Sequence, residues 1–79
     1  MRPDIITQAV PHADPDFLRI MESLPDPPSG IFEKVMAILP QLHELFLRKR
    51  KAASRSDEPA LTRIVDEETA LIRDAMTAA

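Results

Sequence analysis

The chain has 79 residues, a mass of 8.9 kDa and a formal net charge of −3, so we expect one small domain. It has no Cys, Trp or Tyr and only one Gly, which excludes a disulfide framework and a thiolate metal site and argues against a Gly-rich phosphate loop. Hydrophobic residues make up 44% and charged residues 29%, as in a folded chain, and no apolar run is long enough to cross a membrane.

The first segment, residues 1–13, holds Pro3 and Pro11 and has few periodic apolar positions. It lacks both a basic start and a continuous apolar stretch, so we expect no signal peptide and a cytoplasmic protein. We predict an extended N-terminal arm. An arm this short cannot fold alone, so it either frays or packs on its own helices or on a neighbour.

A short helix is predicted over residues 14–24. Asp14 can cap the free N–H groups at its start, and Pro15 suits the first helical position. Apolar residues then recur at helical spacing as far as Pro25, which ends the helix.

The central helix is predicted over residues 30–53, with Asp26 or Ser29 as its cap. Its apolar positions cover an arc of roughly 200° on a helical wheel, whereas a surface helix usually needs only a little over about 100°. This helix therefore needs neighbours on more than one side. Pro40 interrupts it, but the apolar phase continues across Pro40, so we favour one kinked helix over two helices broken near Leu39.

The last helix is predicted over residues 57–77, capped by Asp57 or Ser56 and joined to the central helix by a short connection. Such a connection between two amphipathic helices predicts an antiparallel hairpin. The expected fold is therefore all-α. It comprises a short N-terminal helix and an antiparallel helical hairpin with a long Pro-kinked central helix, and residues 14–79 form one small helical domain.

Two polar residues, His43 and Glu68, fall inside the apolar stripes of the two hairpin helices. If the chain reverses near residues 54–55, they lie within about one helical turn of each other. Because an unpaired buried carboxylate is costly, we predict that they form a buried polar pair that fixes the register of the hairpin. The alternatives are a contact with a ligand or partner and, less favoured, general acid–base catalysis.

The basic residues are strongly segregated. Residues 1–47 carry three basic and seven acidic residues, residues 48–55 carry five basic residues, and residues 56–79 carry two basic and six acidic residues. The favoured interpretation of the basic run is a solvated helix end, or pairing with a neighbour's acidic face. The alternative is an anion-binding site for nucleic acid, a lipid surface or an acidic protein, formed by Arg48, Lys49, Arg50, Lys51 and Arg55.

Phe46 and Leu47 extend the apolar arc of the central helix beyond what one hairpin partner can cover, and Met36 and Met76 add adaptable apolar surface. We therefore predict a partner-binding surface at these four residues. The alternative is that the first helix and the arm cover all of this surface.

The predicted function is that of a small non-enzymatic protein-interaction module. It would be an adaptor, inhibitor or accessory subunit, a class frequent among phage-encoded proteins, that binds an unidentified protein and forms a homo-oligomer. We expect no cofactor, because no Ser-His-acid arrangement, P-loop or dinucleotide motif is present. We also expect no metal, because His12, Asp14 and Asp16 have no second His or Cys nearby. The alternatives are weak nucleic-acid binding or regulation through residues 48–55, and small-molecule binding at an oligomer interface near His43 and Glu68.

Overall fold

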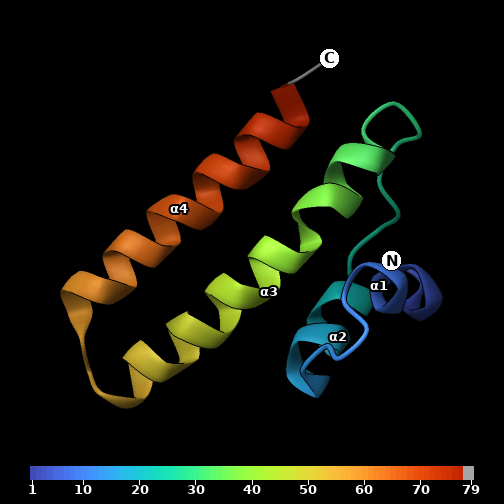
Figure 1. Cartoon of the computed structure of the whole chain (residues 1–79). Helices are drawn as coiled ribbons and strands as arrows, with labels where there is room; N and C mark the ends of the chain where they lie inside the picture. The colour runs from blue at the N-terminus through green and yellow to red at the C-terminus, as the bar shows by residue number, and fades with distance from the viewer. Residues whose placement is uncertain (78–79) are drawn as a thin grey trace.

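The computed structural model describes residues 1–77, which form four α-helices and no strand (Figure 1). The helices are α1 (Pro3–Ala9), α2 (Pro15–Glu22), α3 (Phe32–Ser54) and α4 (Glu58–Thr77). The predicted all-α fold is confirmed. A short helix, α2, precedes an antiparallel hairpin of α3 and α4, and no helix within residues 1–77 has the length and hydrophobicity needed to cross a membrane.

The prediction of an extended arm over residues 1–13 was wrong, because residues 3–9 form the helix α1. Pro3 occupies its first turn, where the missing N–H has no helical partner, and Asp4 complements the positive end of the helix. Ile6 and Val10 are spaced by one helical turn, and both are buried in the core. The segment therefore packs on its own helices, and this packing stabilises a helix too short to persist alone.

The ends of α2 and α3 show one correct and one incorrect capping prediction. Asp14 caps α2, since its side chain accepts a hydrogen bond from the backbone N–H of Asp16. Neither Asp26 nor Ser29 caps α3. Ile31 occupies the cap position without a side-chain hydrogen bond, because the preceding turn closes through its N–H onto the carbonyl of Pro28.

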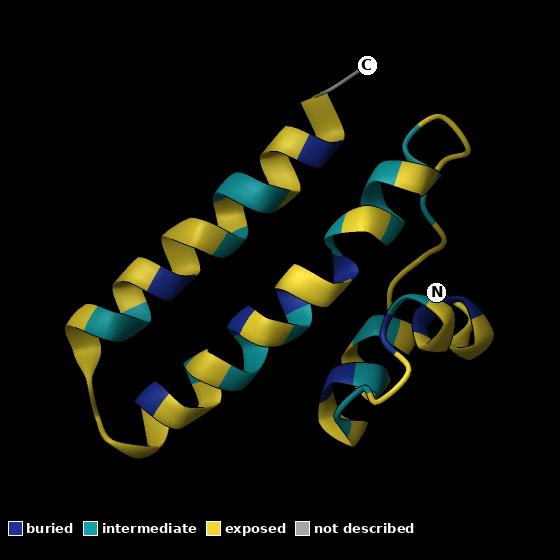
Figure 2. Cartoon of the chain, viewed as in Figure 1, coloured by how far each residue is buried: buried dark blue, intermediate teal, exposed yellow. Residues whose placement is uncertain are grey.

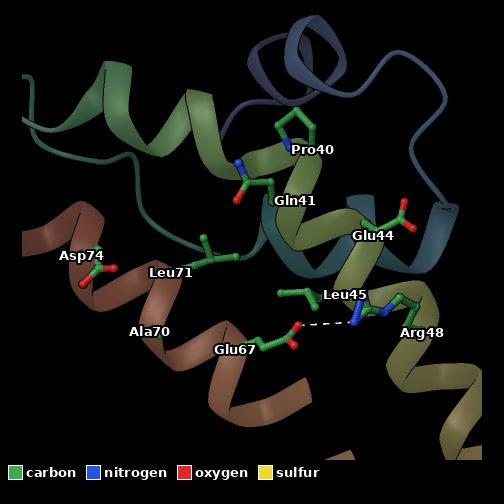
Figure 3. A pocket seen from close by; sticks show the side chains of 9 residues that line it. All are labelled: Pro40, Gln41, Glu44, Leu45, Arg48, Glu67, Ala70, Leu71 and Asp74. Atoms are coloured by element: carbon green, nitrogen blue, oxygen red, sulfur yellow. Dashed lines mark hydrogen bonds and ion pairs between the residues drawn. The ribbon is translucent and has the colours of Figure 1, made fainter. Parts of the chain in front are cut away.

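The central helix continues through Pro40, which is exposed on the polar side of α3. Proline has no N–H to donate to the carbonyl one turn earlier, and its ring crowds that turn. The axis of α3 changes direction near Pro40 in Figure 3, in agreement with the kinked helix favoured from the sequence.

A tight turn joins α3 to α4. Ser56 adopts a left-handed conformation with φ of 55°, and the N–H groups of Ser56 and Asp57 donate to the carbonyls of Ala53 and Ala52. This pattern is the Schellman motif, which commonly ends α-helices. Asp57, rather than Ser56, then caps α4, since its carboxylate accepts from the N–H of Ala60 at 3.3 Å.

The core forms on two sides of α3, as Figures 1 and 2 show. One cluster joins α3 to the N-terminal helices and contains Ile6, Val10, Phe17, Leu39 and Leu42. The other joins α3 to α4 and contains Leu45, Ala52 and Ile64. The wide apolar arc of α3 is thus covered by α1 and α2 on one side and by α4 on another.

Candidate interaction surface

An open groove with a volume of about 610 Å³ runs along one side of the α3–α4 hairpin (Figure 3). Leu45, Ala70 and Leu71 supply its apolar floor, between residues of the two helices. Its rim is charged, with three carboxylates and one guanidinium. We call this feature the hairpin groove, and it is lined by Pro40, Gln41, Glu44, Leu45, Arg48, Glu67, Ala70, Leu71 and Asp74.

A second, smaller hollow of about 250 Å³ lies nearer the α3–α4 turn and shares Arg48 with the hairpin groove. Four cationic side chains line it, with Asp57 as the one carboxylate among its lining residues. We call it the basic hollow, and its cations come from Arg48, Lys51, Arg55 and Arg63. The two depressions together make one side of the hairpin acidic near Pro40 and basic near the turn.

The basic run of α3 does not act as a single patch. Arg48 pairs with Glu67 of α4 at 3.3 Å, and Lys49 pairs with Glu68 of α4 at 2.9 Å. Arg50 points to the other side of α3 and pairs with Asp14 at 2.7 Å. Acidic side chains of other helices of the same chain therefore neutralise three of the five residues.

Lys51 and Arg55 have no ion pair within residues 1–77. Sequence reasoning missed Arg63, which lies on α4 and adds a fourth cation to the hollow. Knowledge of the hairpin register, that is, of which residues of α3 and α4 lie level, could have identified Arg63. Because Arg48 pairs with Glu67 and Lys49 with Glu68, Arg63 falls level with Ala52, between Arg48 and Arg55.

The Asp14–Arg50 contact perturbs both groups. The hydrogen bond from the Arg50 guanidinium holds the pKa of the Asp14 carboxyl below its ordinary value of 3.8, against the opposing effect of partial burial. The backbone N–H of Asp16 adds to this lowering. The same hydrogen bond raises the pKa of Arg50, so the ion pair remains charged at neutral pH.

The predicted buried pair of His43 and Glu68 is wrong. His43 accepts the backbone N–H of Asp14 through Nε2 at 3.0 Å, and its ring meets that of Phe17 edge-on with centroids 5.0 Å apart. Glu68 pairs instead with Lys49, and both His43 and Glu68 are only half-buried. The reason is that α2 docks on the face of α3 that carries His43, whereas α4 packs on a different face.

The four residues of the predicted partner-binding surface are in different environments. Phe46 is half-buried against the ring of Phe17, at 5.5 Å between centroids, and Met36 packs against the first core cluster. Leu47 is also half-buried. Met76 of α4, by contrast, is 58% exposed. The N-terminal helices α1 and α2 thus cover much of the apolar surface at Phe46 and Met36 that was predicted to bind a partner.

Two further apolar residues of α4, Val65 and Ile72, are exposed together with Met76. The helix α4 packs mainly on α3, so one edge of its apolar face is left exposed.

Comparisons with protein-family models, curated proteins and solved structures gave no match for this chain. The function is therefore inferred from the chemistry of its surfaces.

Proposed function

We propose that this protein is a small non-enzymatic protein-interaction module that binds a helix of another protein in the hairpin groove and also associates with itself. It acts as an adaptor, inhibitor or accessory subunit in the cytoplasm. The observation that carries this proposal is the groove itself, an apolar floor of Leu45, Ala70 and Leu71 between charged rims.

The groove suits an amphipathic helix. Two antiparallel helices already form its walls, and a third helix laid between them would bury apolar side chains against Leu45 and Leu71. The charges of the rim would also fix the orientation of the bound helix, because Glu44 and Asp74 lie toward the Pro40 end and the basic hollow lies toward the turn. A partner helix with a basic end and an acidic end would bind in one orientation only.

The engagement of the titratable side chains supports a non-enzymatic role. The His43 ring accepts a backbone hydrogen bond and packs on Phe17, and Glu68 is held by Lys49. Both therefore have structural partners of their own. The alternative of a small molecule bound at an oligomer interface near these two residues stays a prediction.

The test is affinity capture from the source cell with Ala70→Arg and Ala53→Arg as matched variants. Ala70 lines the groove, so an arginine there fills it, whereas Ala53 is exposed on α3 outside the groove. A protein captured by the wild type and by Ala53→Arg should bind Ala70→Arg at least about tenfold more weakly, a loss of 1.4 kcal/mol in binding free energy. Equal binding to both variants, with helical content unchanged by circular dichroism, would contradict the groove as the binding site.

The basic hollow supports a second candidate function, the binding of nucleic-acid phosphates. Arg48, Lys51, Arg55 and Arg63 converge there from two helices. A footprint of so few cations predicts weak binding that falls steeply with salt. An electrophoretic mobility shift with DNA at low salt, lost in the double variant Arg55→Glu/Arg63→Glu, is expected for this function. No shift of the wild type at low salt would dismiss it.

A further inference from the structure

An apolar stripe runs along the face of α4 that has no neighbour within residues 1–77. Val65 is 46%, Ile72 48% and Met76 58% exposed, whereas Ile64 and Ala75 of the same helix are 5% and 6% exposed. The three exposed residues follow one another at intervals of seven and four positions, which places them on one face of the helix. We call this face the outer stripe.

Thr69 completes the outer stripe between Val65 and Ile72. Its hydroxyl donates a hydrogen bond to the backbone carbonyl of Val65 at 2.9 Å. The polar atom is thus satisfied within the helix, and the side chain can offer its methyl group to a neighbour. Covering this face would therefore leave no unsatisfied side-chain polar group at its centre.

Two opposite charges, Asp66 and Arg73, flank the outer stripe on the same edge. They are seven positions apart, and side chains pair within a helix only at a spacing of three or four. Both are exposed, and neither has an ion-pair partner within residues 1–77. One edge thus presents a negative charge and, two turns further on, a positive charge.

We propose that a second copy of this chain packs its α4 antiparallel on the outer stripe. A two-fold axis between two antiparallel helices brings the same edge of both together, so Asp66 of each copy meets Arg73 of the other. The same arrangement sets Val65 opposite Met76 and Thr69 opposite Ile72. The charges on this edge of α4 are complementary to those on the same edge of a second copy. This self-complementarity favours a second copy over an unrelated partner.

The inference rests on the self-association proposed above and assigns it a surface. Glu67, Ala70 and Asp74 lie on a different face of α4, along the hairpin groove. A dimer formed through the outer stripe therefore leaves the groove open in both copies. A chain of this size buries a modest fraction of its surface alone, so association through an apolar face also stabilises the fold.

The test is the mass in solution, measured by sedimentation or light scattering at about 100 µM, above the micromolar range expected for a small interface. We expect about twice the chain mass of 8.9 kDa. Asp66→Arg and Arg73→Asp should each weaken the dimer at least about tenfold. An equimolar mixture of the two variants should recover it, because every cross-pair is then attractive. The control Asp74→Arg reverses a charge on the groove side and should leave the mass unchanged.

Other outcomes separate this interface from the proposed function. A wild-type monomer at this concentration would overturn the self-association and the interface together. A dimer that survives Asp66→Arg and also Ile72→Glu would overturn this interface alone. In both cases the comparison of Ala70→Arg with Ala53→Arg still decides independently whether the groove binds a partner.

Discussion

His43 is the residue that fixes the start of α2 against the middle of α3. Its Nε2 accepts a hydrogen bond from the backbone N–H of Asp14 at 3.0 Å. The Asp14 carboxylate in turn accepts from Asp16 and from Arg50. Three different groups thus hold one residue, Asp14, at the junction of two helices.

We expect His43→Leu to lower the free energy of unfolding by about 1–3 kcal/mol, because the half-buried N–H of Asp14 is left without an acceptor. His43→Gln keeps an acceptor oxygen and should cost less. Urea unfolding at neutral pH, followed by circular dichroism, measures the difference. Equal losses for the two variants would show that packing on Phe17, rather than the hydrogen bond, sets the contribution of His43.

At the scale of the element, α1 closes the side of α3 that α4 leaves open. Ile6 is fully buried in the cluster that includes Phe17 and Leu39, although α1 is only seven residues long. The helix owes its stability to this burial, since a helix of one or two turns does not persist in water by itself.

Ile6→Ala should therefore cost about 2–5 kcal/mol, a large part of the roughly 5–15 kcal/mol by which domains are stable. Ile20→Ala removes the same atoms from α2, but Ile20 is 48% exposed. That variant should stay within about 0.5 kcal/mol of the wild type. Thermal and urea unfolding of the pair make the comparison, and similar losses for both would mean that α1 is not part of the stable core.

At the scale of the whole molecule, the basic run at the end of α3 connects the other helices. Arg50 reaches back to Asp14 and Asp16 at the start of α2, while Arg48 and Lys49 reach across to α4. Charges that are segregated along the chain are thus brought together in space, and the acidic segments on both sides of the run supply its partners.

The Asp14–Arg50 pair makes this arrangement sensitive to acid. Because the folded state lowers the pKa of Asp14, the stabilisation is complete above the ordinary carboxyl value of 3.8 and is lost as the pH falls through the lower, folded-state value. We expect Arg50→Gln to be less stable than the wild type at neutral pH, with the difference constant down to about pH 5 and shrinking below about pH 4.

Urea unfolding of both proteins across this pH range measures the effect. Lys51→Gln is the matched control, since Lys51 is exposed and has no ion pair within residues 1–77. Its difference from the wild type should be smaller and should lack this dependence on acid. A gap between Arg50→Gln and the wild type that persists unchanged at low pH would contradict the role of Asp14.

The sequence by itself determined α2, α3 and α4 to within two residues at each end, because these limits depend mostly on neighbours a few positions away, although the caps that it assigned to α3 were wrong. Asp14 and Pro15 start α2, the apolar phase carries α3 through Pro40, and Asp57 caps α4. Pro3 and Asp4 give α1 similar local start signals, but they did not suffice to predict it, because a helix of seven residues depends on burial against α2 and α3.

Only the tertiary structure decided which faces meet. His43 bonds to a residue 29 positions away, and Lys49, not His43, is the partner of Glu68. A helical wheel gives the direction of a side chain around its own helix but not the neighbour on that side. That neighbour depends on how segments far apart in the sequence pack around one small core. The same packing leaves the outer stripe of α4 exposed.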